Sequence, residues 1–328
     1  MALDNSNLNR HFEKIATNGV TLRCVVEGSG PLAVMVHGWP ESWYSWRHQI
    51  DLVRDAGYRV VVPDVRGYGE SDAPAAIEAY DMETMIGDVL GLIDHFDEKQ
   101  AVLFGHDWGA PIVWNTTALH PERVRAVAAM SVPYSPRGKM SSMALWRQLF
   151  PTRFFYQLYF QKPGVAEAEF EADIRTALRK IYYSGSGDAP NSMFKADKPR
   201  DARMLDDMPS PEVFPSWLTE SDLDYYAAQF EKNGFRGTLN RYRNQDRDWE
   251  NLTALEGARI TPPACFIAGS RDAVLRFIPG VDMVENMKRW VDDLRVCEII
   301  DGAGHWIQQE RPEKVNAALL KFLGTLDA

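Results

Sequence analysis

An aspartate stands at the centre of the most informative motif in this chain. The motif, residues 105–109 (GHDWG), follows the apolar run at 101–104 and leads into the apolar residues 110–114. Strand, tight turn and helix in this order are typical of a nucleophile elbow, G-x-S-x-G, with Asp107 in place of the serine. A carboxylate, with a usual pKa of about 3.9, is ionised at neutral pH and attacks without a base. The motif therefore predicts an ester-forming enzyme that opens C–O or C–halogen bonds.

Asp272 and His305 are the residues that complete a catalytic triad. Asp272 ends the segment GSRD after an apolar run at 264–269, and His305 lies in the glycine-rich segment DGAGHW after a run at 296–300. The order nucleophile, acid, histidine is the order expected behind an elbow. All three residues then lie just past the carboxyl ends of strands, where open α/β sheets bind ligands. Either residue alone would be an ordinary loop residue, and only their joint position favours catalysis.

An oxyanion hole needs two backbone N–H donors. One is expected from Trp108, directly after the nucleophile, and the other from Trp39 in the segment HGWP at 37–40, which follows the apolar residues 34–36. Alternatively, the His-Gly pair at 37–38 could serve only to end the strand, without a role in the site. His106, next to the nucleophile, is expected to point away and pack.

The elements that position these residues alternate between strand-like and helical patterns. Continuous apolar runs, as in a parallel sheet covered on both faces, predict a doubly wound α/β core. Expected strands are 21–27, 32–37, 59–63, 101–105, 126–131, 264–269 and 296–300; expected helices are 46–56, 82–96, 111–120, 281–294 and 312–323.

A helical insertion interrupts this core. The sequence indicates a first core segment at 1–135, a helical cap at 136–248 and a second core segment at 249–328. Within the cap, residues 184–221 are rich in Gly, Pro, Asp and Ser and are expected to form a long loop. We favour a mobile flap over the entrance for this loop, with a plain surface loop as the alternative.

Composition excludes several other classes of function. The chain has 328 residues and a net charge of −10, which disfavours nucleic acid or an anionic membrane as a partner. No stretch approaches the roughly 20 apolar residues of a membrane span. Three scattered cysteines give no disulfide framework, and the first residues have no signal-peptide pattern. We expect a cytoplasmic protein.

Further motifs extend the pattern along the chain: 37–40 (HGWP) with 45–49 (SWRHQ), 64–69 (DVRGYG), 105–109 (GHDWG), 156–161 (YQLYFQ), 164–167 (GVAE), 234–237 (GFRG) and 241–244 (RYRN). Taken together, these motifs resemble those of the soluble epoxide hydrolases, along nearly the whole chain. The resemblance implies an α/β-hydrolase fold with a mostly parallel, doubly wound, eight-stranded sheet and a helical cap, and no metal or organic cofactor. It also implies that two cap tyrosines, Tyr156 and Tyr242, hydrogen-bond the epoxide oxygen.

The resemblance implies a reaction in two steps. Asp107 attacks an epoxide carbon to form an ester, and a water activated by the His305–Asp272 pair then hydrolyses it to a vicinal diol. Because His305 must be neutral to act as a base, activity is expected to fall at acid pH, near or below about 6.5.

The expected partners of the site are an epoxide and water. Substrate contacts are assigned to four residues: His37, Trp39, Trp108 and Phe155. Their aromatic character suggests an apolar pocket for aryl or alkyl epoxides. Substrate identity, regiochemistry and enantiopreference stay open, and so does the oligomeric state, for which a homodimer is considered.

The main alternative is a dehalogenase with the same Asp nucleophile. Haloalkane dehalogenases usually have Asn where this chain has Trp39, and fluoroacetate dehalogenases typically have Arg where it has Trp108. Ester or lactone hydrolysis is a third reading. A binding module that has lost its chemistry is a fourth, although such a chain would be expected to lack the nucleophile or the histidine.

Overall fold

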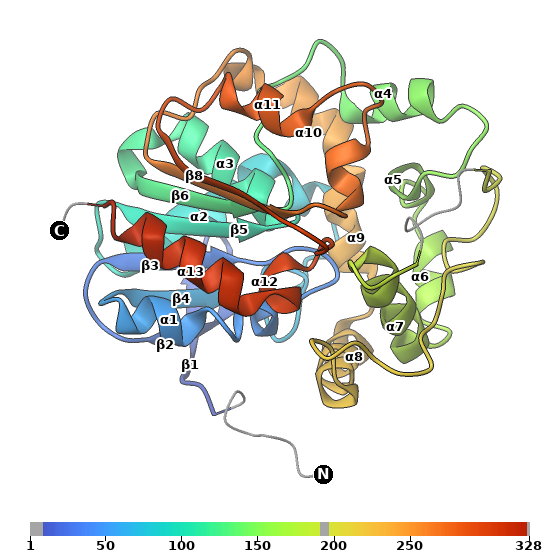
Figure 1. Ribbon diagram of the computed structural model, residues 1–328, viewed down its shortest axis with the longest axis horizontal. Coiled ribbons are helices and arrows are strands. Elements are labelled where there is room, and N and C mark those ends of the chain that lie inside the picture. The colour runs from blue at the N-terminus through green and yellow to red at the C-terminus, as the bar shows by residue number, and fades with distance from the viewer. Residues whose placement is uncertain (1–8, 191–196, 327–328) are drawn as a thin grey trace.

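An eight-stranded sheet runs through the centre of the protein, in a computed structural model that describes residues 9–190 and 197–326 (Figure 1). The strand order is β1-β2-β4-β3-β5-β6-β7-β8, and β2 is antiparallel to β1 and β4 while the others pair in parallel. The strands are β1 (Phe12–Thr17), β2 (Val20–Glu27), β3 (Leu32–Val36), β4 (Arg59–Pro63), β5 (Ala101–His106), β6 (Val124–Met130), β7 (Ala264–Gly269) and β8 (Leu294–Ile300).

Helices cover both faces of this sheet, because its central strands are apolar on both sides. All residues of β3, β5 and β7 are buried. Helices α1 and α13 lie on one face, and α2 and α3 pack together on the other (Figure 1). The core helices are α1 (Ile50–Asp55), α2 (Met82–His95), α3 (Gly109–Leu119), α11 (Met283–Lys288), α12 (Ile307–Glu310) and α13 (Pro312–Leu323).

A group of cap helices fills the chain between β6 and β7; α4 to α8 form the green-to-yellow part on the right of Figure 1, and α9 and α10 lie nearer the sheet, in orange. These helices are α4 (Ser142–Leu149), α5 (Tyr156–Tyr159), α6 (Val165–Phe170), α7 (Ile174–Gly185), α8 (Glu220–Asn233), α9 (Arg236–Arg243) and α10 (Gln245–Asn251). We keep the division into core and cap as a proposal. The cap boundary expected at residue 248 falls inside α10, which contacts α4.

The expected long loop at 184–221 is shorter at both ends. Helix α7 continues to Gly185 and α8 begins at Glu220, with no regular helix between them in the described parts, 186–190 and 197–219. Residues 191–196 of the expected flap lie outside the described residues. The described part is anchored, since Glu169 accepts the backbone N–H groups of Met204 and Leu205 at 3.0 and 2.9 Å. Movement of a flap stays a prediction.

The structure departs from the expected elements at several points. Strand β1 was missed because its residues FEKIAT alternate weakly and much of it is exposed at the sheet edge. The helix expected at 46–56 is a 3₁₀ turn, Trp43–Trp46, followed by α1 from Ile50. The helix expected at 281–294 is only α11, because Val291 pairs with Ile260 in an isolated β-bridge. In the described part of the chain no helix is long and apolar enough to cross a membrane.

Glycines allow the nucleophile turn to sit tightly against the neighbouring strand. A Cβ on Gly109 would lie 2.0 Å from the carbonyl oxygen of Val36, and a Cβ on Gly105 would lie 2.3 Å from that of Gly109. Backbone atoms cannot move aside as the end of a flexible side chain can. Strand β5, the turn and α3 therefore fit against β3 only without side chains at these positions.

We predict that Gly109→Ala destabilises the fold by about 1–3 kcal/mol, the usual cost of forcing atoms into a packed core. Chemical denaturation measures the change. Gly138→Ala is the matched control, because its Cβ would meet only the carbonyl oxygen of Met140 at 3.5 Å. Equal midpoints for both variants would contradict the steric argument.

Candidate active site

Asp107 lies in the sharp turn between β5 and α3, with a backbone φ of +50°. Few residues other than glycine adopt this conformation, and aspartate is among those that tolerate it. The turn projects the carboxylate beyond the strand ends toward the cap. Its approach to the loop after β3 is close, since a Cβ on Gly38 would lie 2.3 Å from the Cβ of Asp107.

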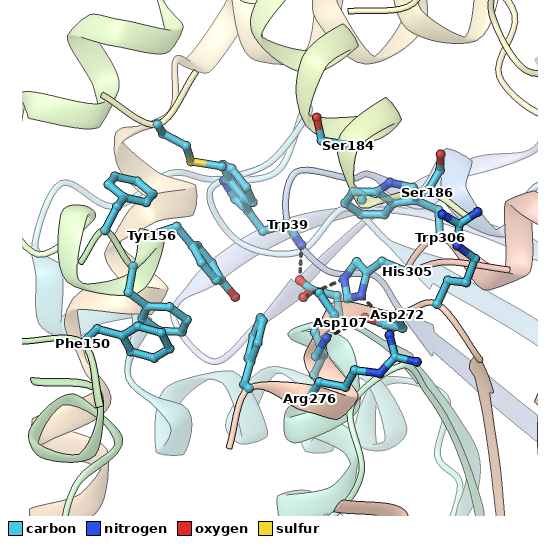
Figure 2. Close-up of a pocket in the computed structure, with 18 of the residues that line it drawn as sticks. Trp39, Asp107, Phe150, Tyr156, Ser184, Ser186, Asp272, Arg276, His305 and Trp306 are labelled. Atoms are coloured by element: carbon cyan, nitrogen blue, oxygen red, sulfur yellow. Dashed lines mark hydrogen bonds and ion pairs between the residues drawn. The ribbon is translucent and has the colours of Figure 1, made fainter. Parts of the chain in front are cut away.

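The structure brings the three predicted triad residues together (Figure 2). His305 Nε2 lies 3.2 Å from Asp107 Oδ2, and His305 Nδ1 lies 3.0 Å from Asp272 Oδ2. The three residues lie close together because β5, β6, β7 and β8 pair in parallel. The loops that carry them therefore all leave the sheet at the carboxyl ends of its strands. Asp272 is 1% exposed, so its charge acts on the imidazole with little screening by water.

One of the two expected oxyanion donors already contacts the nucleophile. The backbone N–H of Trp39 donates to Asp107 Oδ1 at 2.7 Å (Figure 2). Trp108 caps the N-terminus of α3, where the first N–H groups of a helix have no partner within the helix. Asp107 Oδ1 is therefore the oxygen placed to carry negative charge when the ester carbonyl is attacked.

The charges of the triad shift its pKa values in opposite directions. Burial alone would raise the pKa of Asp107, but the hydrogen bond and charge of His305 outweigh it and hold that pKa below the usual value. Burial alone would lower the pKa of His305, but Asp272 and Asp107 together raise it well above the usual 6.5. In the resting site Asp107 is thus an anion and His305 a cation at neutral pH.

His106 points away from the nucleophile, as expected, but it does more than pack. Its Nδ1 lies 2.8 Å from Glu41 Oε2 and its Nε2 lies 2.7 Å from the backbone carbonyl of His305. Glu41 also accepts the N–H of Gly38 at 2.9 Å. Sequence reasoning missed Glu41, although an acid directly after residues 37–40 was a visible signal. The Ser131 hydroxyl donates to the same His305 carbonyl at 2.7 Å.

Tyr156 and Tyr242 reach the site from the cap, from α5 and α9. Their ring centroids are 5.9 Å apart, and both residues line the cavity that contains Asp107. Gln157 Nε2 donates to the Tyr156 oxygen at 3.0 Å. Burial and the charge of Asp107 raise the pKa of both phenols, that of Tyr242 well above 10. Both tyrosines are therefore protonated donors at neutral pH.

Two cavities meet at Asp107 and Tyr156, with volumes of about 550 and 400 Å³. Trp39 and Phe155 line the first and Trp108 lines the second, so three of the four expected substrate contacts face these spaces.

His37 is the fourth expected contact, and the structure places it elsewhere. Its ring is 1% exposed and is absent from the lining of both cavities. Nε2 accepts the N–H of Val65 at 3.0 Å, and Nδ1 lies 2.9 Å from the carbonyl of Gly38. His37 therefore supports the oxyanion loop rather than touching substrate.

No cluster of three or more His, Cys, Asp or Glu side chains that could hold a metal ion occurs within residues 9–190 and 197–326. The chemistry described above needs only carboxylate, imidazole, phenol and backbone N–H groups. Independence from cofactors remains a prediction.

Fold and site together define a class of protein. Residues 31–312 match the model of the alpha/beta hydrolase fold family. The chain is 44% identical to epoxide hydrolase A of Mycobacterium tuberculosis (strain ATCC 25618 / H37Rv), with 95% of this chain and 97% of that protein covered. The chain belongs to the alpha/beta hydrolase fold family and, within it, to the epoxide hydrolases.

Solved structures agree with this assignment. The crystal structure of epoxide hydrolase A from Mycobacterium thermoresistibile is 46% identical, with a TM-score of 0.91 over 97% of this chain and 99% of that one. An epoxide hydrolase from an endophytic Streptomyces is 42% identical, with a TM-score of 0.92 over 97% and 96% of the two chains.

We predict that Asp272→Asn lowers the pKa of His305, because Asp272 is the largest of the charges that raise it. NMR titration of the imidazole measures this pKa. Asp301→Asn is the control, since the exposed Asp301 lies in the same loop but pairs with Ser270. An unchanged His305 titration in the Asp272 variant would contradict the proposed origin of the shift.

Proposed function

We propose that this protein hydrolyses epoxides to vicinal diols through a covalent ester on Asp107. The observation that carries the proposal is that one cavity is lined by a nucleophile and by proton donors. The ionised carboxylate of Asp107 comes from the core, and two protonated phenols come from the cap. An epoxide needs both, a nucleophile at carbon and a proton donor at oxygen. The similarity to epoxide hydrolases supports the same reaction.

In the first step, a carboxylate oxygen of Asp107 attacks an epoxide carbon and the C–O bond of the ring breaks. The electron pair of that bond goes to the oxygen, which takes a proton from Tyr156 or Tyr242. The phenolate regains its proton through water from the His305 imidazolium. His305 is left neutral, and its Nε2 then accepts a proton from the hydrolytic water.

In the second step, the hydroxide formed by this proton transfer adds to the ester carbonyl of Asp107. The N–H groups of Trp39 and Trp108 stabilise the tetrahedral oxyanion. Collapse breaks the ester bond, and the departing alkoxide takes the proton of the new Asp107 carboxylic acid. The diol leaves, and the site returns to the carboxylate of Asp107 paired with the imidazolium of His305.

The cap tyrosines favour an epoxide over an alkyl halide. An alkoxide is a poor leaving group until it is protonated, whereas a halide leaves as a stable anion and needs only N–H donors. Two phenols that line the cavity beside Asp107 are useful for the first reaction and unnecessary for the second.

We also infer a cytoplasmic location, which the three free cysteines support, since cysteines in oxidising compartments usually form disulfides. The proposed partners are a small epoxide and water, without nucleic acid or membrane. The oligomeric state stays open, and a homodimer remains to be tested.

We predict that His305→Gln traps the ester, because the first step does not need a base and the second does. Mass spectrometry after brief exposure to styrene oxide should show an adduct of intact epoxide mass on Asp107. Asp107→Ala is the control and should show none. Absence of the adduct, with no diol from the unaltered enzyme and several epoxides, would overturn the proposal; haloalkanes would then be the next substrates to test.

The two steps should also differ in their pH dependence. Ester formation needs ionised Asp107, whose pKa is held low, so its rate should stay level from about pH 5 to 8. Ester hydrolysis needs neutral His305. Since the charge of Asp107 is absent from the ester, the pKa of His305 there is lower than in the resting site, and hydrolysis should slow as pH falls through it. Single-turnover rates separate the steps; a hydrolysis rate that is level over this range would contradict His305 as base.

A further inference from the structure

Arg241 is a buried cation next to one of the two cap tyrosines. It precedes Tyr242 on α9, is 2% exposed, and is absent from the lining of both cavities. Its guanidinium forms an ion pair with Asp248 and donates to the carbonyl of Tyr80. Burial lowers the pKa of Arg241 to about 9, so the group still carries its charge at neutral pH.

The cation contacts the site through the indole of Trp108. The Arg241 guanidinium carbon lies 4.9 Å from the centroid of that ring, over its face. The Tyr242 ring meets the same indole edge-on, with centroids 5.2 Å apart and planes at 82°. The guanidinium thus contacts the indole, the indole contacts the phenol, and the phenol lines the cavity.

The Trp108 ring therefore contacts both the Arg241 cation and the Tyr242 phenol. A cation over the face of an indole is attracted by its π electrons, so Arg241 holds the ring against which the phenol packs. Burial and the charge of Asp107 raise the pKa of Tyr242, and its polar interaction with the Trp108 side chain acts against them. An interaction that favours the phenolate makes the phenol a better proton donor to the epoxide oxygen.

We propose that Arg241 is a positioning residue for ring opening: it holds the Trp108 indole against Tyr242, in the arrangement that favours the phenolate that Tyr242 becomes. The inference rests on the proposed function. In that step the Tyr242 proton moves to the alkoxide oxygen, and the electron pair of the O–H bond stays on the phenolate, whose ring packs against Trp108.

Arg241 also has a structural role, and the experiment must separate the two. Asp248 accepts the backbone N–H of Met82 at 2.7 Å, so the Arg241–Asp248 pair links α9 and α10 to the start of α2. Loss of the arginine will therefore lower stability whatever its effect on catalysis.

A double-mutant cycle tests the inference. Arg241→Met is made with and without Tyr242→Phe, and the rate of ester formation from styrene oxide is measured in single turnover. We expect Arg241→Met to slow ester formation about tenfold when Tyr242 is present, the scale of a desolvated cation–π contact. With Tyr242→Phe in place the factor should approach one, because the group through which Arg241 acts is gone. Arg241→Lys, which keeps a cation near the indole, should recover part of the rate.

Arg243→Met is the matched control, because Arg243 is a buried arginine of the same helix that pairs with Glu167 at 2.7 Å. Its effect should be the same with or without Tyr242→Phe. If Arg241→Met does not fold, Arg241→Gln replaces it in the cycle.

The outcomes separate the two proposals. No diol from the unaltered enzyme would overturn the proposed function. Normal turnover together with an Arg241 effect that is absent, or equal in both backgrounds, would overturn only the positioning role. Failure of Arg241→Lys to recover any rate would also count against it.

Discussion

The negative charge of Asp107 is the interaction on which the rest of the site depends. It helps to raise the pKa values of His305, Tyr156 and Tyr242 above their usual ranges. Formation of the ester removes this charge. The phenols then become better acids as the alkoxide needs a proton, and His305 loses its proton more readily before it must act as a base. One covalent event therefore prepares the groups for the step that follows.

The fold maintains this charge by combining burial with a small number of fixed partners. Asp107 is 8% exposed, and water alone would not stabilise its carboxylate there. The Trp39 N–H and the imidazole of His305 take that role at 2.7 and 3.2 Å. These contacts require the loop after β3 to lie against the turn after β5, and the absence of a side chain at Gly38 permits this approach.

The sequence predicted the core more completely than the cap. The parallel strands and the catalytic loops follow from apolar runs and from residues placed at strand ends, so Asp107, Asp272 and His305 could be found from the chain alone. Contacts from the cap depend on packing between distant segments, which no local pattern records. Tyr156 and Tyr242 could be assigned only through a resemblance to a known family, and His37 contacts Val65 rather than the cavity. The contact between Arg241 on α9 and Trp108 joins segments more than 130 residues apart and has no signal in the sequence.

Glu41 shows why such buried contacts matter for catalysis. One of its carboxylate oxygens accepts the Gly38 N–H in the oxyanion loop and pairs with His106, which in turn contacts the backbone carbonyl of His305. The loop that supplies the oxyanion donor and the loop that supplies the base are thereby tied to a single buried group. Because hydrolysis needs the N–H donor at the ester carbonyl and the base at the water that attacks it, a shared anchor favours a fixed separation between the two.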